Sequence, residues 1–190
     1  MLFTRKLCYR PAYLTSLTLN PAGTLTPAFA TNTYSYTATE TYGNAPTVTV
    51  TDGNLNATNR LIHNGATNVL ASGAASGALS LTLGQTNVVQ VQVTAQDGVT
   101  MQTYTVNVTQ LPNQATQPGL TNSVSNGILN LSWGLDRLGY RLLMQTNNLS
   151  QGVSSNPSDW ATMPGSAATN ALAIPIITTN LDEYYRLIYP

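Results

Sequence analysis

Apolar and polar residues alternate along most of the first hundred residues. The clearest runs cover 89–95 and 104–108, where Val, Ala or Tyr recurs at every second position with Gln, Thr or Asn between. A period of two places apolar side chains on one face of a strand and polar side chains on the other. Shorter runs of this kind predict further strands at Leu17 and Leu19, Tyr34 to Ala38, Val48 and Val50, and Leu79 to Leu83. Helical periodicity is nearly absent, so we expect an all-β chain.

Turn residues separate these runs. Asp97-Gly98 lies between the two clearest runs and predicts a hairpin, because its turn needs a residue that tolerates positive φ. Six or seven short strands in about a hundred residues are typical of a β-sandwich. We therefore expect a β-sandwich in this part of the chain. The core positions expected within one strand pair are Val91, Val93, Tyr104 and Val106.

A second, smaller set of strands follows the first. The alternation stops after Thr109, and the segment 111–120, with its two prolines, is typical of a linker. Residues 121–190 then carry alternating triplets that predict a smaller antiparallel β module. These triplets are Leu129, Leu131 and Trp133; Tyr140, Leu142 and Met144; and Leu172, Ile174 and Ile176. Pro175 removes a backbone donor, so the third of these strands is expected at a sheet edge.

Two segments favour contacts between copies of the chain. The final run, Tyr184–Tyr189, is apolar on both faces and is expected to leave an open edge. Residues 1–11 form an N-terminal extension, a candidate donor strand, and strand addition needs such a segment and an open edge. The candidate assembly residues are Phe3, Leu7 and Tyr9 in the extension and Tyr185, Leu187 and Tyr189 in the final run. The alternative is that residues 1–10 fold back along their own module or form a leader without fixed structure.

Two motifs at the ends of the first module resemble a known family. The opening, LxxLxL…GxLxPxF, is carried by Leu14, Leu17, Leu19, Gly23, Leu25, Pro27 and Phe29, followed by Tyr34 and Tyr36. The close, GxNxVxVxVxAxDG…TYTVxV, is carried by Gly84, Asn87, Val89, Val91, Val93, Ala95, Asp97, Gly98, Thr103, Tyr104 and Val106. Over residues 12–110 the chain thus resembles the bacterial cadherin-like β-sandwich domain, a module of secreted and surface proteins. This resemblance implies an immunoglobulin- and cadherin-like β-sandwich there. Calcium binding does not carry over, because the chain lacks clustered acidic ligands.

The second module resembles a short C-terminal β module of large secreted repeat proteins of environmental bacteria. Its residues in that pattern are Leu129, Leu131, Ser132, Trp133, Gly139, Tyr140, Arg141, Gln145, Thr146, Asn147, Asn148, Trp160, Pro164, Gly165, Ser166, Tyr185, Arg186 and Leu187. Gly134 stands where that module has proline. The LSW…YRL pattern is also similar to fibronectin type III strands. Neither resemblance implies an activity.

Composition narrows the classes of partner. Only 7% of residues are charged, against roughly 25% in an average soluble domain. The net charge of +0 gives no electrostatic basis for binding nucleic acid or anionic lipid. One cysteine cannot form an internal disulfide, and no apolar stretch reaches the roughly 20 residues of a membrane span. The first residues lack the apolar run of a signal peptide, yet a composition poor in Lys and Glu favours an extracellular or cell-surface location.

Candidate chemistry is sparse. The single histidine, His63, lies beside the turn signal Asn64-Gly65 and is expected to be solvated. A lone His and a lone Cys cannot build a zinc site, and Asp52-Gly53-Asn54 is interpreted as a turn. We therefore expect no catalytic, cofactor-binding or metal-binding residues and no cofactor. Trp160 follows a loop and is the one candidate for stacking on a ligand, whereas the alternation places Trp133 in the core.

These observations favour a non-enzymatic structural or adhesive protein that acts through protein–protein contacts. Its partners are expected to include copies of itself, joined by strand addition into a fibre. The alternative is a carbohydrate-binding or spacer module of a larger secreted enzyme. An autonomous enzyme is disfavoured because the chain lacks an evident general base.

Overall fold

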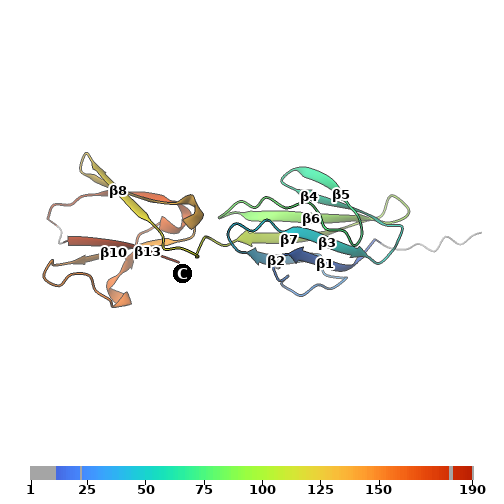
Figure 1. Ribbon diagram of the computed structural model, residues 1–190, viewed down its shortest axis with the longest axis horizontal. Helices are drawn as coiled ribbons and strands as arrows, with labels where there is room; N and C mark the ends of the chain where they lie inside the picture. Colours follow the sequence, from blue (N-terminus) through green and yellow to red (C-terminus); the bar gives the residue numbers. More distant parts are fainter. Residues whose placement is uncertain (1–11, 22, 180–181, 190) are drawn as a thin grey trace, which may run out of the picture. The chain divides into compact units, whose positions relative to one another are not determined.

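The computed structural model describes residues 12–21, 23–179 and 182–189, and they form an all-β fold. Strands and three short 3₁₀ turns make up the regular structure of these residues, and none of it is α-helical. No helix within these ranges is long and apolar enough to cross a membrane. The chain divides into two compact units, Met1–Leu111 (unit 1) and Pro112–Pro190 (unit 2), each shown in Figure 1.

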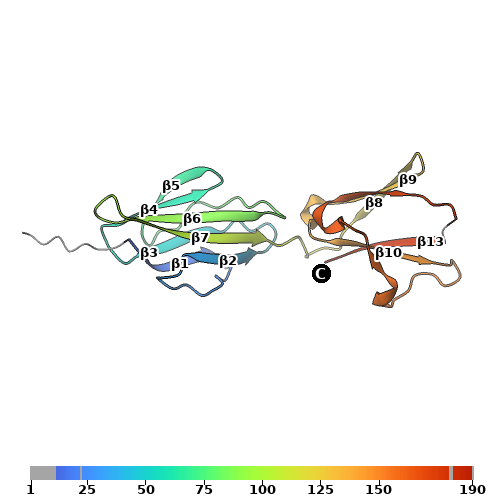
Figure 2. The same ribbon diagram turned by 180° about the vertical axis from the view of Figure 1, so that it is seen from behind.

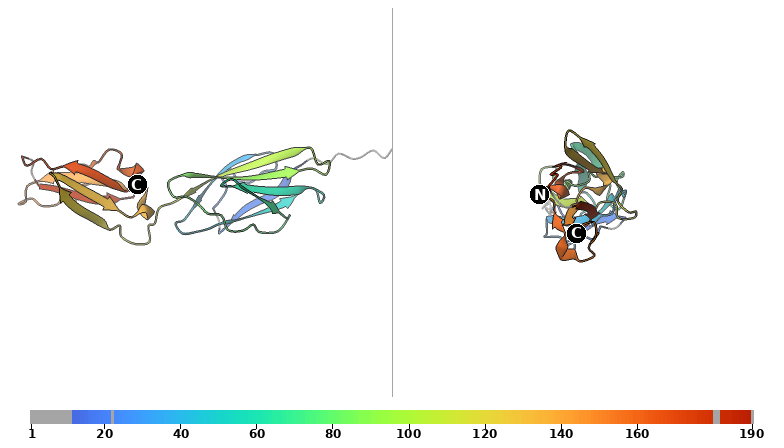
Figure 3. Two further views of the ribbon diagram at one scale, coloured as in Figure 1. Left: turned by 90° about the horizontal axis from the view of Figure 1, so that it is seen from above. Right: turned by 90° about the vertical axis from the view of Figure 1, so that its left-hand side faces the viewer.

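Unit 1 is a sandwich of two sheets. Its strands are β1 (Leu14–Asn20), β2 (Ser35–Glu40), β3 (Thr47–Asp52), β4 (Thr58–His63), β5 (Ala66–Leu70), β6 (Thr86–Thr94) and β7 (Met101–Gln110). One sheet has the order β2-β7-β6-β4-β5, and the other pairs β1 with β3. Only β2 and β7 pair in parallel, and the remaining pairs are antiparallel. The strands of unit 1 run roughly along one common direction (Figure 3).

The core of unit 1 lies on the apolar faces that the alternation predicts. Val91 pairs with Tyr104 across β6 and β7, and Val89 pairs with Val106, with all four side chains buried. Val93 is buried on the same face, so the expected register is confirmed. Each fully buried Val contributes about 1.5–3 kcal/mol relative to an exposed one. The expected hairpin between β6 and β7 is also present.

Tyr104 joins the core to the first strand. Its hydroxyl accepts a hydrogen bond from the backbone N–H of Leu14 (3.0 Å) and donates one to the carbonyl of Thr31 (3.0 Å). Burial raises the pKa of the Tyr104 phenol above its ordinary value. The ring therefore fills the core while its hydroxyl satisfies two backbone groups from distant segments.

The strand expected at Leu79 to Leu83 is absent. Instead the N–H groups of Gly73, Ser76 and Leu79 each donate to a carbonyl in or just before β3, at 2.7–2.8 Å. Bonds spaced three residues apart cannot form a regular ladder, whose hydrogen-bonded positions recur every second residue. The segment therefore follows the outer edge of β3 irregularly, and only Leu79 of the expected run is fully buried.

Four strands have no counterpart in the expected pattern: β4, β5, β8 (Leu120–Ser125) and the two-residue β11 (Ala161–Thr162). Strands β5 and β8 are almost entirely exposed, so they lack the apolar alternation that marks a buried face. Two-residue turns join β5 to β4 and β8 to the next strand. These turns are Asn64-Gly65 and Asn126-Gly127, and all four residues have positive φ. Such Asn-Gly turns match the twist of the strands that they join.

Unit 2 contains two small sheets. After β8 come β9 (Ile128–Trp133), β10 (Arg141–Asn147), β11 (Ala161–Thr162), β12 (Ala171–Pro175) and β13 (Asp182–Ile188). The 3₁₀ turns are η1 (Leu135–Arg137), η2 (Pro157–Asp159) and η3 (Ser166–Ala168). The sheets have the orders β12-β9-β8 and β11-β10-β13, and Figure 2 shows them as two layers. Strand β12 is at an edge, as Pro175 predicts.

The core of unit 2 joins these two sheets. Leu131 and Trp133 of β9 pack with Leu142 of β10 and Ile174 of β12, which confirms Trp133 as a core residue. A buried guanidinium, that of Arg137, donates to the carbonyl of Asn113 and pairs with Asp136 (3.4 Å). The expected linker, residues 111–120, thus includes Asn113, whose carbonyl is hydrogen-bonded within unit 2.

Candidate functional site

A groove lies at one edge of unit 1, where the two sheets differ in width. Five strands lie over two, so the edge strand β5 extends past β3 and is faced by the coil at 76–80. The space between them, here called the β5 groove, has a volume of about 420 Å³. Its lining residues are Leu61, His63, Asn64, Ala66, Asn68, Val69, Leu70, Ser76, Gly77, Ala78, Leu79 and Ser80.

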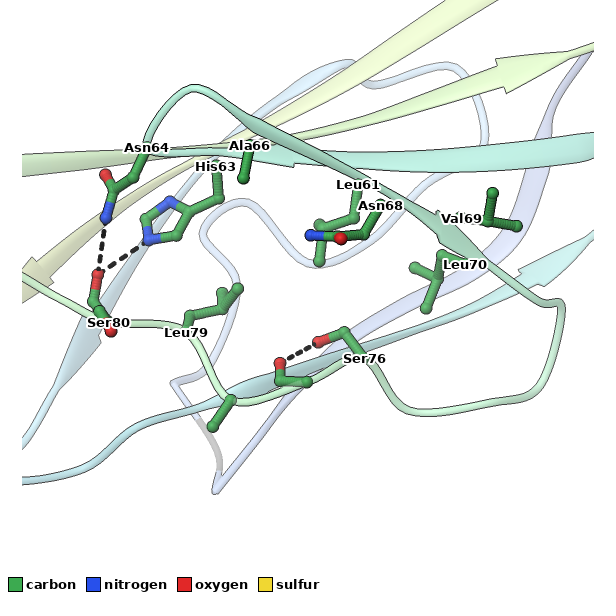
Figure 4. Close-up of a pocket in the computed structure, with 12 residues that line it drawn as sticks. Leu61, His63, Asn64, Ala66, Asn68, Val69, Leu70, Ser76, Leu79 and Ser80 are labelled. Atoms are coloured by element: carbon green, nitrogen blue, oxygen red, sulfur yellow. Dashed lines mark hydrogen bonds between the residues drawn. The ribbon is translucent and has the colours of Figure 1, made fainter.

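The β5 groove is apolar at its base and polar along its rim. Leu61, Leu70 and Leu79 are buried, whereas Asn68 is exposed on the inward-facing side of β5. Figure 4 shows Asn68 between Leu61 and Leu70 on one wall, with Ser76 on the facing coil. Among the lining residues only His63 is ionisable or aromatic. This surface offers no stacking platform for a sugar ring and no fixed charge for an ion, and it suits an uncharged extended segment.

His63 is the last residue of β4, and its ring is held by the backbone. Its Nδ1 lies 3.0 Å from the carbonyl oxygen of Val88, and its Nε2 lies 2.8 Å from that of Ser80. The Asn64 side-chain amide donates to the same Ser80 carbonyl (3.1 Å), as Figure 4 shows. The expected solvated turn residue is therefore half-buried between the coil and β6, and because a neutral imidazole carries one N–H, it donates to one of these two carbonyls at a time. Neither ring nitrogen points freely into the groove.

The outer edge of β5 presents unpaired backbone groups. A two-residue hairpin closes on a hydrogen-bonded pair, here His63 with Ala66, and bonded and non-bonded pairs then alternate along the ladder. Thr67 and Val69 fall at non-bonded positions opposite β4, so their N–H and C=O groups face away from the sheet. Within the described ranges, no hydrogen bond joins another segment to these groups.

The candidate assembly residues lie partly inside and partly outside the described residues. Phe3, Leu7 and Tyr9 lie outside the described residues. Strand β13 pairs with β10 alone and is an edge of its sheet. Tyr185 and Leu187 pack against the core of unit 2, and Tyr189 lies 5.4 Å from Tyr140 between ring centroids. The part of these residues in assembly stays a prediction.

Trp160 lies on β10 and β13 of unit 2 behind a polar loop. Its indole N–H donates to the Ser154 carbonyl (3.0 Å), and its side chain is only 9% exposed. The Arg186 guanidinium lies 4.1 Å from the ring centroid. A ligand reaches this ring face only if Arg186 moves, and the stacking role of Trp160 stays a prediction.

The acidic residues accept hydrogen bonds within turns and from nearby side chains. Asp97 in the β6–β7 turn accepts from the hydroxyl and N–H of Thr100 and from the N–H of Val99, and these bonds lower its pKa. Asp52 accepts from the Asn59 amide (3.0 Å). Across the described ranges, no three His, Cys, Asp or Glu side chains gather closely enough to hold a metal ion.

Comparison with known proteins identifies the family of unit 1. Residues 14–111 match a family model described as a cadherin-like beta sandwich domain, which covers more than half of the chain and all strands from β1 to β7. No curated protein matches the chain. The family match ends at Leu111, so the resemblance expected for the second module stays a prediction.

Proposed function

This chain belongs to the cadherin-like beta sandwich domain family, and on that premise we propose that it is a non-enzymatic structural or adhesive protein outside the cell. It acts at the cell surface or in the extracellular space through protein–protein contacts. Its partners include further copies of the chain, joined by strand addition into a fibre. The observation that carries this proposal is the open, uncharged edge of β5 beside its groove.

Two further features support a binding role over catalysis. The chain has one histidine, and its ring nitrogens both contact backbone carbonyls, which leaves it unsuited to act as a general base. The low content of charged residues also reduces repulsion between copies that approach closely. An exposed strand edge is itself a template for pairing with another chain.

Sedimentation velocity and electron microscopy of the full-length protein test this function. We expect ordered species larger than a dimer, whose mass rises with protein concentration. A protein that stays monomeric at high concentration contradicts self-assembly. A donor role of residues 1–10 predicts that their deletion lowers the particle mass while circular dichroism still reports folded strands.

A further inference from the structure

Most sheet edges of unit 1 are protected against pairing with another chain. Strand β1 carries a register shift between Leu14 and Ser16, and such bulges turn an edge away from flat pairing. Strand β2 is covered at Thr37, which exchanges two backbone hydrogen bonds of 2.8 Å with Thr26. Strand β3 is covered by the irregular coil that ends at Leu79. These three edges are therefore poor acceptors.

Most sheet edges of unit 2 are protected too. Strand β12 contains Pro175, which lacks a backbone donor. Strand β13 carries Asp182, Glu183 and Arg186, and charged side chains discourage edge-to-edge pairing. Strand β11 is two residues long. Each of these edges offers little to an incoming strand.

Two edges lack every one of these protections. Strands β5 (ATNVL) and β8 (LTNSVS) contain no charged residue, no proline and no register shift. Each strand adjoins an Asn-Gly turn at the margin of its unit, and the tip of the β8–β9 hairpin stands clear of unit 2 (Figures 1 and 2). These strands are the two open edges that the described part of the chain leaves unguarded.

The backbone of β8 matches that of β5. The Asn126-Gly127 turn closes on the pair Ser125 with Ile128, so Asn122 and Val124 fall at non-bonded positions opposite β9. Their N–H and C=O groups face outward, as those of Thr67 and Val69 do on β5. Neither set of groups is bonded to another segment among the residues that the structure describes.

We propose that the edge of β5 binds the edge of β8 from a second copy of the chain. In antiparallel addition the residues with outward backbone groups pair with one another. Val69 and Val124, which are 84% and 63% exposed, then lie on one face and shield each other from water. In this register Ser125 lies opposite Asn68 and Ser123 lies opposite Leu70, on the face of the β5 groove. The neutral edges meet without burying a charge, which is otherwise costly.

This contact joins unlike surfaces, so it propagates from copy to copy unless the copies close into a ring. Each copy carries one β5 edge and one β8 edge, so a copy that uses both binds two neighbours, head to tail. The inference rests on the proposed function and names the strands that perform it. It involves neither residues 1–10 nor β13, so deletion of residues 1–10 leaves this contact intact.

Proline substitutions at the two edges test the contact in the full-length chain. Val69→Pro and Val124→Pro each remove one outward N–H, and proline is tolerated where an edge N–H faces solvent. Val69→Thr and Val124→Thr are matched controls, because they keep the N–H on a β-branched side chain. We expect both proline variants to sediment as monomers with unchanged circular dichroism, and both threonine variants to assemble as the unmodified chain does. If a proline variant unfolds, Val69→Lys or Val124→Lys blocks the same edge with a charge.

A mixture of the two proline variants distinguishes pairing of β5 with β8 from pairing of β5 with β5. Each variant keeps one functional edge, so an equimolar mixture should form dimers that do not grow further. If β5 instead paired with β5, Val124→Pro alone would assemble normally, and that result overturns the proposal. Assembly of both proline variants at the mass of the unmodified protein also overturns it, while self-assembly as a function would stand. An unmodified chain that stays monomeric overturns both.

Discussion

Unit 1 and unit 2 are stabilised in different ways. Among the described residues, the buried cluster of unit 1 contains nineteen apolar residues drawn from both sheets, whereas that of unit 2 contains four, with Tyr140, Leu143 and Trp160 buried outside it. Around those four, Leu172, Tyr185 and Leu187 are only partly buried. Unit 2 also buries a guanidinium, that of Arg137, against Asn113, Tyr140 and Asp136.

The difference shows how strand number controls the stability of a sandwich. A five-stranded sheet buries the apolar faces of several strands completely, so its stability is distributed over many side chains. The smaller sheets of unit 2 leave side chains such as Tyr185 and Leu187 half-buried, and half-buried side chains contribute less. A buried ion pair adds little net stability, since desolvation offsets its attraction. We therefore expect two separate melting transitions, with that of unit 2 at lower temperature.

Val91→Asp in unit 1 is expected to cause the largest loss of stability. Val91 is 1% exposed, and an unpaired buried carboxylate costs on the order of several kcal/mol against a total stability of about 5–15 kcal/mol. We expect the transition of unit 1 to disappear in calorimetry while that of unit 2 remains. Val88→Asp on the same strand, at a 46% exposed side chain, is the control and should leave both transitions. A surviving cooperative transition of unit 1 in Val91→Asp would mean that the register of β6 is wrong.

A matched pair of leucine truncations compares how the two cores respond to the same loss of buried volume. Leu17 in unit 1 and Leu142 in unit 2 are both fully buried, and Leu→Ala costs about 2–5 kcal/mol at such sites. The same loss is a larger share of the stability of the smaller core. Leu142→Ala should therefore lower the melting temperature of unit 2 more than Leu17→Ala lowers that of unit 1. Equal shifts measured by calorimetry would contradict the distributed-core explanation.

Alkaline melting gives the smallest expected effect. Tyr104→Phe leaves the N–H of Leu14 without its partner, a cost of about 1–3 kcal/mol. Burial raises the pKa of Tyr104 in unit 1 and, with the Glu183 hydrogen bond, that of Tyr185 in unit 2. The stability linked to each phenol is complete below the ordinary tyrosine pKa of about 10 and is lost as pH rises through the raised value.

Both units should therefore melt at lower temperature as the pH rises above about 10. In Tyr104→Phe this alkaline decrease should become smaller for unit 1 and stay unchanged for unit 2. Calorimetry of the two transitions across this pH range measures it. An alkaline decrease in unit 1 that is as large in Tyr104→Phe as in the unmodified chain would show that another group causes it.

The candidate site was less predictable than the core around it. The turn signal at Asn64-Gly65 is visible in the sequence, but it does not show that the next strand, β5, stays at an edge. Nor does the sequence show that both nitrogens of His63 contact carbonyls from residues 88 and 80, which only chain folding brings close. A paired Asn-Gly turn beside an uncharged exposed strand is the one local signal that marks both β5 and β8.

The alternation of apolar residues predicted most of the side chains that form the core of unit 1, whereas Leu61 and Leu70 are buried on strands that it did not predict. A buried sheet face requires apolar residues at every second position, and that requirement is written in runs such as 89–95. The tertiary structure alone decided which strands are neighbours and which edges stay open. Those properties depend on pairing between segments far apart in the chain, and exposed strands such as β5 and β8 need no apolar pattern to form. Core residues on long alternating strands are therefore predictable from the sequence, whereas the open strand edges are not.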